Sequence, residues 1–170
     1  LIKIILGLIE PSEGAVFVDD IRLEAFGLKH YRAQVGAVLQ NDGLFAGSIA
    51  ENIALFDKLS DMDRVIASAR AAALHDDIAA MPMGYETLVG DMGAAISGGQ
   101  KQRLILARAL YRQPRLLVID EGTSHLDEDK ERQVNAAIAA LGVTRIVVAH
   151  SRQTISAADR ILRLSDGKLE

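Results

Sequence analysis

The 170-residue sequence contains no cysteine. This absence excludes a disulfide framework and a thiolate metal site, and it fits a reducing compartment. No apolar run approaches the roughly 18 to 20 residues that a helix needs to span a bilayer. The apolar segment 1–9 contains Lys3 and no small-residue cleavage site, so it does not have the pattern of a secretory signal. A membrane role would therefore depend on a partner or on sequence outside these residues.

Aromatic residues are scarce, at 4% of the sequence with no tryptophan, whereas 49% of the residues are apolar. This aliphatic composition favours layered α/β packing over a β-sandwich. The length suits one domain with a sizeable core. The formal net charge of -4 lacks the concentrated Lys and Arg that nucleic-acid binding requires. We therefore expect no nucleic-acid partner.

The phosphate-binding P-loop, whose pattern is G-x-x-x-x-G-K-[ST], is also missing. The nearest approach is the segment 93–98, but Gly99 and Gln100 follow where Lys and Ser or Thr are required. The sequence therefore has no lysine that this pattern would place on the terminal phosphates of a nucleotide.

What the sequence does contain is an alternation of strand-like and helix-like segments. The firmest local prediction is a helix from about Asp61 to Leu74, because 60–63 matches a capping box and apolar residues follow at helical spacing. The expected strands lie at 15–18, 35–39, 116–120, 145–149 and 160–164. The other expected helices lie at 1–8, which we expect to be buried, at 100–112, 128–141 and 153–158, and just before Met81.

This alternation predicts an α/β fold with a mainly parallel sheet flanked by helices on both faces. The segment 116–120 is a continuous apolar run bounded by turn residues, as expected of a strand buried on both faces, and we expect 145–149 to be another buried strand. The segment 41–95 is helical and interrupted by glycines. We interpret it as a helical lobe inserted into the α/β core.

A glycine turn precedes the helix expected at 100–112. It consists of Ser97, Gly98, Gly99 and Gln100. Free N–H groups and the positive end of the helix dipole would face whatever occupies the turn, and two adjacent glycines let a phosphate approach the backbone closely. The same residues match a Ser-x-x-Gln capping box, so a purely structural cap is the alternative interpretation.

Two carboxylates, Asp120 and Glu121, end the strand expected at 116–120. They would lie at the carboxyl edge of a parallel sheet, where such folds bind ligands. Because successive side chains of a strand point to opposite sides, one carboxylate can hold Mg²⁺ through water while the other orients an attacking water. Many strands end in an acid without any such role, so a structural interpretation stays open.

Gln40 and His150 follow two other expected strands and reach the same edge. Taken singly, each is more simply an incidental hydrogen-bonding residue. His30, His75 and His125 share no ligand spacing, so we expect surface positions and no zinc site. Arg103 and Arg108 lie on the helix after the glycines, and we expect them on a solvated or lobe-contacting face.

Together and in this order, these elements resemble the nucleotide-binding domain of ATP-binding-cassette (ABC) transporters over essentially the whole chain. The segment 96–103 is similar to the family signature, 116–121 to the Walker B strand and 124–127 to the D-loop. Gln40 matches the Q-loop, and His150 matches the switch histidine.

The resemblance implies a head-to-tail pair of such domains. The ATP of one domain would lie against the signature turn of the other, formed by Ser97, Gly98, Gly99 and Gln100. Asp127 would contact the partner across the interface. A second nucleotide-binding domain is therefore the first expected partner.

The resemblance also implies ATP and Mg²⁺ as cofactors. Asp120 and Gln40 would serve the Mg²⁺, and Gln40 would link the site to the membrane part. Glu121 would polarise the attacking water, and His150 would contact the γ-phosphate. Glu121 and His150 are the expected catalytic residues of an ATPase.

Three local segments narrow the class of ABC protein that the sequence resembles. The segments 44–53 and 84–90 are similar to exporter domains, in which the ATPase is usually fused to a transmembrane domain. The segment 121–127 is similar to bacterial peptide exporters of the colicin V type, which often carry a peptidase domain. The resemblance implies a peptide or protein substrate such as a bacteriocin, and a place at the cytoplasmic face of the bacterial inner membrane.

The alternative is a soluble ABC-type mechanical ATPase acting on DNA or ribosomes. Such proteins need a long coiled-coil insertion or tandem cassettes, and neither occurs between Gln40 and Ser97.

By this resemblance the core is a RecA-like P-loop NTPase fold truncated at its N-terminus, with Leu1 just after the P-loop. We assign 1–40 and 104–170 to the α/β core, and 41–103 to a helical subdomain. Without the phosphate lysine, the chain is expected to bind ATP poorly and to hydrolyse it negligibly.

Overall fold

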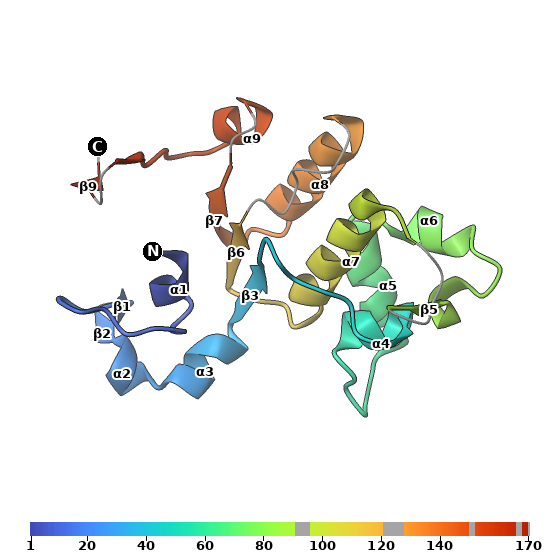
Figure 1. Ribbon diagram of the computed structural model, residues 1–170, viewed down its shortest axis with the longest axis horizontal. Helices are drawn as coiled ribbons and strands as arrows, with labels where there is room; N and C mark the ends of the chain where they lie inside the picture. The colour runs from blue at the N-terminus through green and yellow to red at the C-terminus, as the bar shows by residue number, and fades with distance from the viewer. Residues whose placement is uncertain (91–95, 121–127, 150–151, 166–167, 170) are drawn as a thin grey trace.

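A three-stranded parallel sheet lies at the centre of the computed structural model, which describes residues 1–90, 96–120, 128–149, 152–165 and 168–169 (Figure 1). Its strands are β3 (Val35–Val38), β6 (Leu116–Asp120) and β7 (Thr144–Val148), in the order β3-β6-β7. Leu116 of β6 pairs with Val35 on one side and with Thr144 on the other. The strands therefore start level and end at one edge of the sheet.

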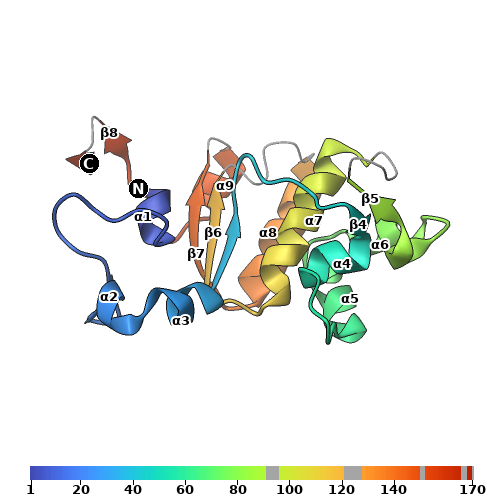
Figure 2. The same ribbon diagram turned by 60° about the horizontal axis from the view of Figure 1, so that its bottom comes forward.

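The central strand β6 is buried on both faces. Leu117, Val118 and Ile119 are each at most 3% exposed, and their side chains alternate between the two faces. Helices α7 (Gly98–Tyr111) and α8 (Glu128–Ala140) lie on one side of the sheet, and the short helix α1 (Ile2–Ile5) lies on the other (Figure 1 and Figure 2). The expected α/β fold, a parallel sheet flanked by helices, is confirmed.

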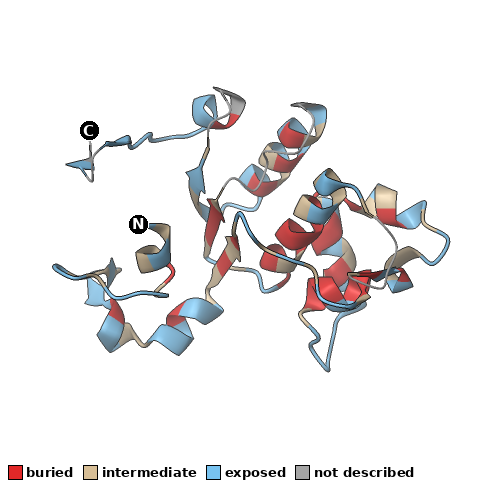
Figure 3. Cartoon of the chain, viewed as in Figure 1, coloured by how far each residue is buried: buried red, intermediate tan, exposed pale blue. Residues whose placement is uncertain are grey.

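A group of helices between β3 and β6 in the sequence packs beside the sheet. Its elements are α4 (Ile49–Ala54), α5 (Met62–Ala71), α6 (His75–Ala79), the 3-10 turn η1 (Gly84–Glu86) and the antiparallel pair of β4 (Gly47–Ser48) and β5 (Leu88–Val89). Helix α7 packs against α4 and α5 and also against β3. The buried residues concentrate where these elements meet (Figure 3).

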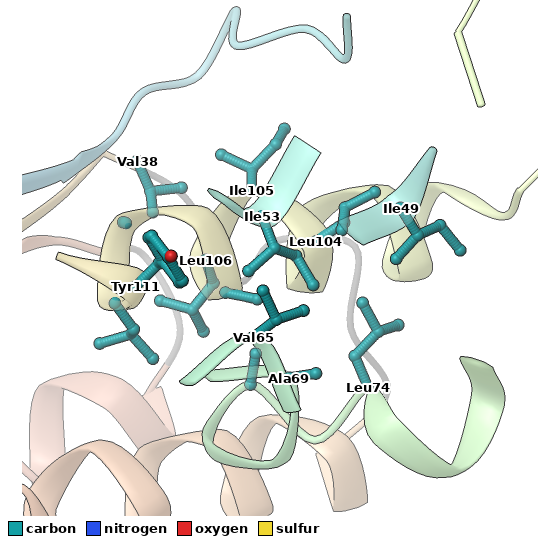
Figure 4. Packing of buried hydrophobic residues seen from close by; sticks show 14 of the residues in the cluster. Val38, Ile49, Ile53, Val65, Ala69, Leu74, Leu104, Ile105, Leu106 and Tyr111 are labelled. Atoms are coloured by element: carbon teal, nitrogen blue, oxygen red, sulfur yellow. The ribbon is translucent and has the colours of Figure 1, made fainter. Parts of the chain in front are cut away.

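The core is continuous from these helices to the sheet. Ile53, Val65 and Leu104 come from α4, α5 and α7, point toward one another and are at most 1% exposed (Figure 4). The same cluster includes Leu117 and Ile119 of β6. Burial of these aliphatic side chains provides the main driving force that holds the helices against the sheet.

Short elements occupy the two ends of the chain. At the start, β1 (Phe17–Val18) and β2 (Ile21–Arg22) form an antiparallel hairpin, followed by α2 (Leu23–Phe26) and α3 (Leu28–Ala33). Tyr31 of α3 is buried, which raises its pKa, and its hydroxyl donates to the Ile5 carbonyl at 2.8 Å. This bond ties α3 to α1. At the other end lie α9 (Arg152–Ser156) and the antiparallel pair β8 (Leu164–Ser165) and β9 (Lys168–Leu169).

Three expectations are wrong at the periphery. The helix expected at 1–8 is only the single turn α1, none of whose residues is buried, although Leu6 directly after it is buried. The strand expected at 160–164 is absent from the described structure, where Leu164 instead begins β8. Strand β7 forms as expected and lies at the edge of the sheet as described, but it is not buried. Its residues Val147 and Val148 are 38% and 36% exposed.

Leu104 provides a test of the core. We expect Leu104→Ala to lower the free energy of unfolding by about 3 kcal/mol, because it removes buried methyl groups and leaves a cavity among three helices. Leu59 is 88% exposed, so Leu59→Ala is the matched control and should cost less than about 0.5 kcal/mol. Urea denaturation of both variants measures the difference, and equal losses would contradict the placement of Leu104.

Candidate functional site

The carboxyl edge of the sheet carries two of the predicted site residues. Asp120 is the last residue of β6, and Gln40 follows the end of β3 by two residues. Because Val38 pairs with Ile119 and neighbouring strands lie about 4.8 Å apart, the register brings both segments to one edge. Asp120 is half-buried and Gln40 is exposed. Their carboxylate and amide oxygens fit Mg²⁺, which is bound by one or two carboxylates together with substrate phosphates.

The other residues predicted for this edge are Glu121, Asp127 and His150, and all three lie outside the described residues. Their roles therefore stay predictions. Within the described part of the chain, no group of three or more His, Cys, Asp or Glu side chains lies close enough together to hold a metal ion. None of the helices in the same ranges has the length and apolar character needed to cross a bilayer.

The glycine turn forms the start of α7 and has the expected capping box. The Ser97 hydroxyl accepts from the Gln100 N–H at 3.1 Å, and the Gln100 side-chain oxygen accepts from the Ser97 N–H at 3.0 Å. The structure therefore assigns the Gln100 side chain to the cap. Ser97 and Gly98 are exposed at the positive end of a helix of 14 residues. The cap therefore leaves Ser97 and Gly98 exposed at the start of the helix.

The buried side chain of Arg103 holds this glycine turn in place. Its side chain is only 7% exposed and pairs with Asp77 of α6, and it also donates to the Ala73 carbonyl. Its Nε donates to the Gly99 carbonyl at 3.3 Å. Arg103 therefore connects the glycine turn to the α5–α6 corner, so of the two faces expected for this residue, solvated or lobe-contacting, the structure shows the lobe-contacting one. The reason is that the corner brings a carboxylate and a carbonyl to the same face of α7.

A buried contact joins the two helices that follow Asp127 and His150 in the sequence. Thr154 of α9 donates to the Glu131 carboxylate of α8 at 2.6 Å, and the two residues are 9% and 6% exposed. Sequence analysis missed this pair. A carboxylate on a helix gives no signal of burial when its partner lies on another element.

His75 is another correction. It is half-buried and its Nδ1 lies 2.9 Å from the Tyr85 hydroxyl, so it is not a simple surface residue. Burial raises the pKa of Tyr85, and the charge of Arg70 opposes that shift. The contact joins α6 to η1 and lies away from the sheet edge. His30 is exposed, as expected.

The chain has the features of an α/β fold of the kind that binds nucleotides. These features are the parallel sheet, the polar residues at its carboxyl edge and the capped glycine turn. The chain belongs to the ABC transporter family, whose sequence model matches residues 1–124. The family expected from the motifs is thereby confirmed.

Curated relatives and a solved structure agree with this assignment. The chain is 46% identical over 164 residues to the probable microcin-H47 secretion/processing ATP-binding protein MchF of Escherichia coli, covering 96% of the chain and 24% of that protein. It is 44% identical to the colicin V secretion/processing ATP-binding protein CvaB of Escherichia coli, with the same coverage.

It is also 44% identical to an ATP-dependent lipid A-core flippase of Burkholderia pseudomallei, covering 99% of the chain and 28% of the flippase. A bacterial Atm1-family ABC exporter solved with ATP bound matches with a TM-score of 0.92 and 35% identity, over 99% of the chain and 30% of the exporter. The chain thus spans about a quarter of the length of the curated relatives it matches.

The capping box allows the structural role of Ser97 to be measured. We expect Ser97→Ala to lower the free energy of unfolding by about 1 kcal/mol, because the Gln100 N–H loses its acceptor, and Ser97→Thr to restore most of that loss. Ser48 caps α4 through the same box with Glu51 and provides the matched comparison. Urea denaturation is the measurement. Unchanged stability in Ser97→Ala would show that the box contributes nothing.

Proposed function

We propose that this chain forms part of the ATP-hydrolysing motor domain of a membrane exporter. The observation that carries the proposal is the sheet register, which brings Asp120 and the Gln40 segment to one edge. Family membership and the 0.92 TM-score to an exporter with ATP bound support the same conclusion. Carboxylate and amide oxygens at this edge suit the Mg²⁺ that accompanies ATP.

In the proposed ATP hydrolysis, four residues have separate roles. Asp120 and Gln40 hold the Mg²⁺ on the phosphates, and when bound this ion neutralises charge that develops during phosphoryl transfer. Glu121 accepts a proton from the attacking water, and His150 donates a hydrogen bond to the γ-phosphate. Most of the rate enhancement then comes from positioning and electrostatics rather than from covalent catalysis.

A second nucleotide-binding domain completes the site in this proposal. Ser97, Gly98 and Gly99 form a turn at a helix N-terminus in which Ser97 and Gly98 are exposed, and such a turn suits the phosphates of a nucleotide held by a partner. Asp127 contacts the partner across the head-to-tail interface. The nucleotide of each domain is thus enclosed by residues of two subunits.

The proposed substrate is a secreted peptide or protein such as a bacteriocin. Its support is the identity of 44–46% to two relatives named for microcin and colicin V secretion. The parent protein then carries its transmembrane domain on the same polypeptide and places this chain at the cytoplasmic face of the bacterial inner membrane. The flippase relative has comparable identity and suggests a lipid substrate as the second candidate.

Glu121 tests the proposed reaction. In the full-length parent protein reconstituted in lipid vesicles, Glu121→Gln should lower ATP hydrolysis by about 100-fold or more, because the amide cannot accept the proton of the attacking water. Glu24 is exposed on α2, so Glu24→Gln is the matched control and should stay within about twofold of the parent. Phosphate release measures both. Undiminished hydrolysis by Glu121→Gln contradicts the proposal.

The 170-residue chain by itself tests how much of the nucleotide site it holds. Its sequence contains no P-loop lysine, so we expect Mg·ATP to bind more weakly than about 1 mM, equivalent to less than about 4 kcal/mol. Titration calorimetry with the isolated chain measures this affinity. A micromolar dissociation constant would contradict this expectation and show that these 170 residues suffice for binding.

A further inference from the structure

Arg108 lies in the second half of α7 and reaches the segment that follows Gln40. Its Nη1 donates to the Gly43 carbonyl at 2.9 Å, its Nε to the Asn52 carbonyl at 3.0 Å and its Nη2 to the Asn52 side-chain oxygen at 2.8 Å. The guanidinium group also lies over the Phe45 ring, 4.9 Å from its centroid. A planar guanidinium can serve these acceptors together, whereas a lysine ammonium cannot.

The Asn52 side chain extends the contacts of Arg108 into a hydrogen-bond network. It is fully buried, and its amide nitrogen donates to the Phe45 carbonyl at 2.9 Å and to the Ser48 carbonyl at 3.0 Å. Its side-chain oxygen accepts from the Phe45 N–H at 3.0 Å in addition to Arg108. The side chain thus makes four hydrogen bonds, which is its full capacity. Fully satisfied buried networks of this kind specify one arrangement of the backbone.

The turn that contains Gln40 is closed by the neighbouring residue Asp42. The Asp42 carboxylate accepts from the Leu39 N–H at 2.9 Å, and the Asp42 N–H donates to the Leu39 carbonyl at 3.1 Å. Gly43, the next residue, is the one that Arg108 holds. Burial lowers the pKa of Arg108, and the negative charge of Asp42 opposes that shift. Arg108 therefore acts on the turn through both a hydrogen bond and a charge.

We propose that Arg108 is a positioning residue, which fixes the Gln40 turn at the sheet edge and connects it to the helix that begins at Ser97. The inference rests on the proposed function, because it assigns Arg108 an effect on hydrolysis through Gln40. By this connection, a displacement of the glycine turn when nucleotide binds is transmitted along α7 to the Gln40 turn. The proposed function assigns the Gln40 turn and the glycine turn at Ser97 to different nucleotides. Arg108 thus joins these two turns mechanically within one chain.

The test is a double-mutant cycle in the full-length parent protein in lipid vesicles. Arg108→Lys keeps the positive charge but loses the planar guanidinium group with its several N–H donors. We expect this variant to lower kcat about tenfold and to change KM for ATP less than about twofold. In a Gln40→Ala background the same substitution should lower kcat less than about twofold, because its effect passes through Gln40. Arg112 is exposed at the end of the same helix, and Arg112→Lys should leave kcat unchanged.

Two results overturn the proposal. One is a kcat for Arg108→Lys within twofold of the parent. The other is an equal loss of kcat with and without Gln40, which indicates a structural role only. If thermal unfolding shows that Arg108→Lys does not fold, Phe45→Leu replaces it in the cycle, because it removes the ring beneath the guanidinium group together with its edge contact to Phe56 and keeps Arg108 itself. Its loss of kcat should likewise disappear in the Gln40→Ala background, and equal losses overturn the proposal.

Measurements of ATP hydrolysis in the same vesicles distinguish a failure of this inference from a failure of the proposed function on which it rests. A parent protein whose hydrolysis is insensitive to Glu121→Gln contradicts the proposed function. A parent protein that loses hydrolysis in Glu121→Gln but shows independent effects of Arg108 and Gln40 contradicts only the positioning role.

Discussion

The burial of β6 on both faces is the constraint on which the rest of the structure depends. A strand that is paired on both edges and covered on both faces can hold only apolar side chains along its length, as Leu117, Val118 and Ile119 do. Polar groups are then confined to its end, where the backbone leaves the sheet. Asp120 occupies that position. The same packing that stabilises the fold therefore places a carboxylate at the carboxyl edge, beside the end of β3.

Helix α7 carries the second constraint, because it belongs to both parts of the core. It packs against α4 and α5 as well as against β3. Arg103 and Arg108 are five residues apart on this helix, which corresponds to roughly 140° around its axis and about 7.5 Å along it. One guanidinium group therefore reaches the α5–α6 corner while the other reaches the segment after Gln40. The helix is held on two different sides.

Much of the centre of the fold could be predicted from the sequence. Strand β6 begins at Leu116 and ends at Asp120, as expected, because a continuous aliphatic run bounded by turns reports burial directly. The Ser97 cap was also predictable, since a capping box is a local pattern. In contrast, β7 has the same aliphatic pattern and is exposed in this structure. Periodicity reports which side chains favour burial, whereas the coverage of a strand depends on elements elsewhere.

The candidate site was predictable where it follows strand ends and not where it depends on contacts between elements. Asp120 and Gln40 were found because parallel strands bring their carboxyl ends together. The partner of Arg103 was not predicted, and Asn52 and the Glu131–Thr154 pair were missed, since each contact depends on a partner on another element. A buried polar side chain must find hydrogen-bond partners, so these residues constrain the relative positions of the elements more tightly than aliphatic packing does. The residues that fix the relative positions of the elements are therefore the ones whose pairing the sequence leaves unspecified.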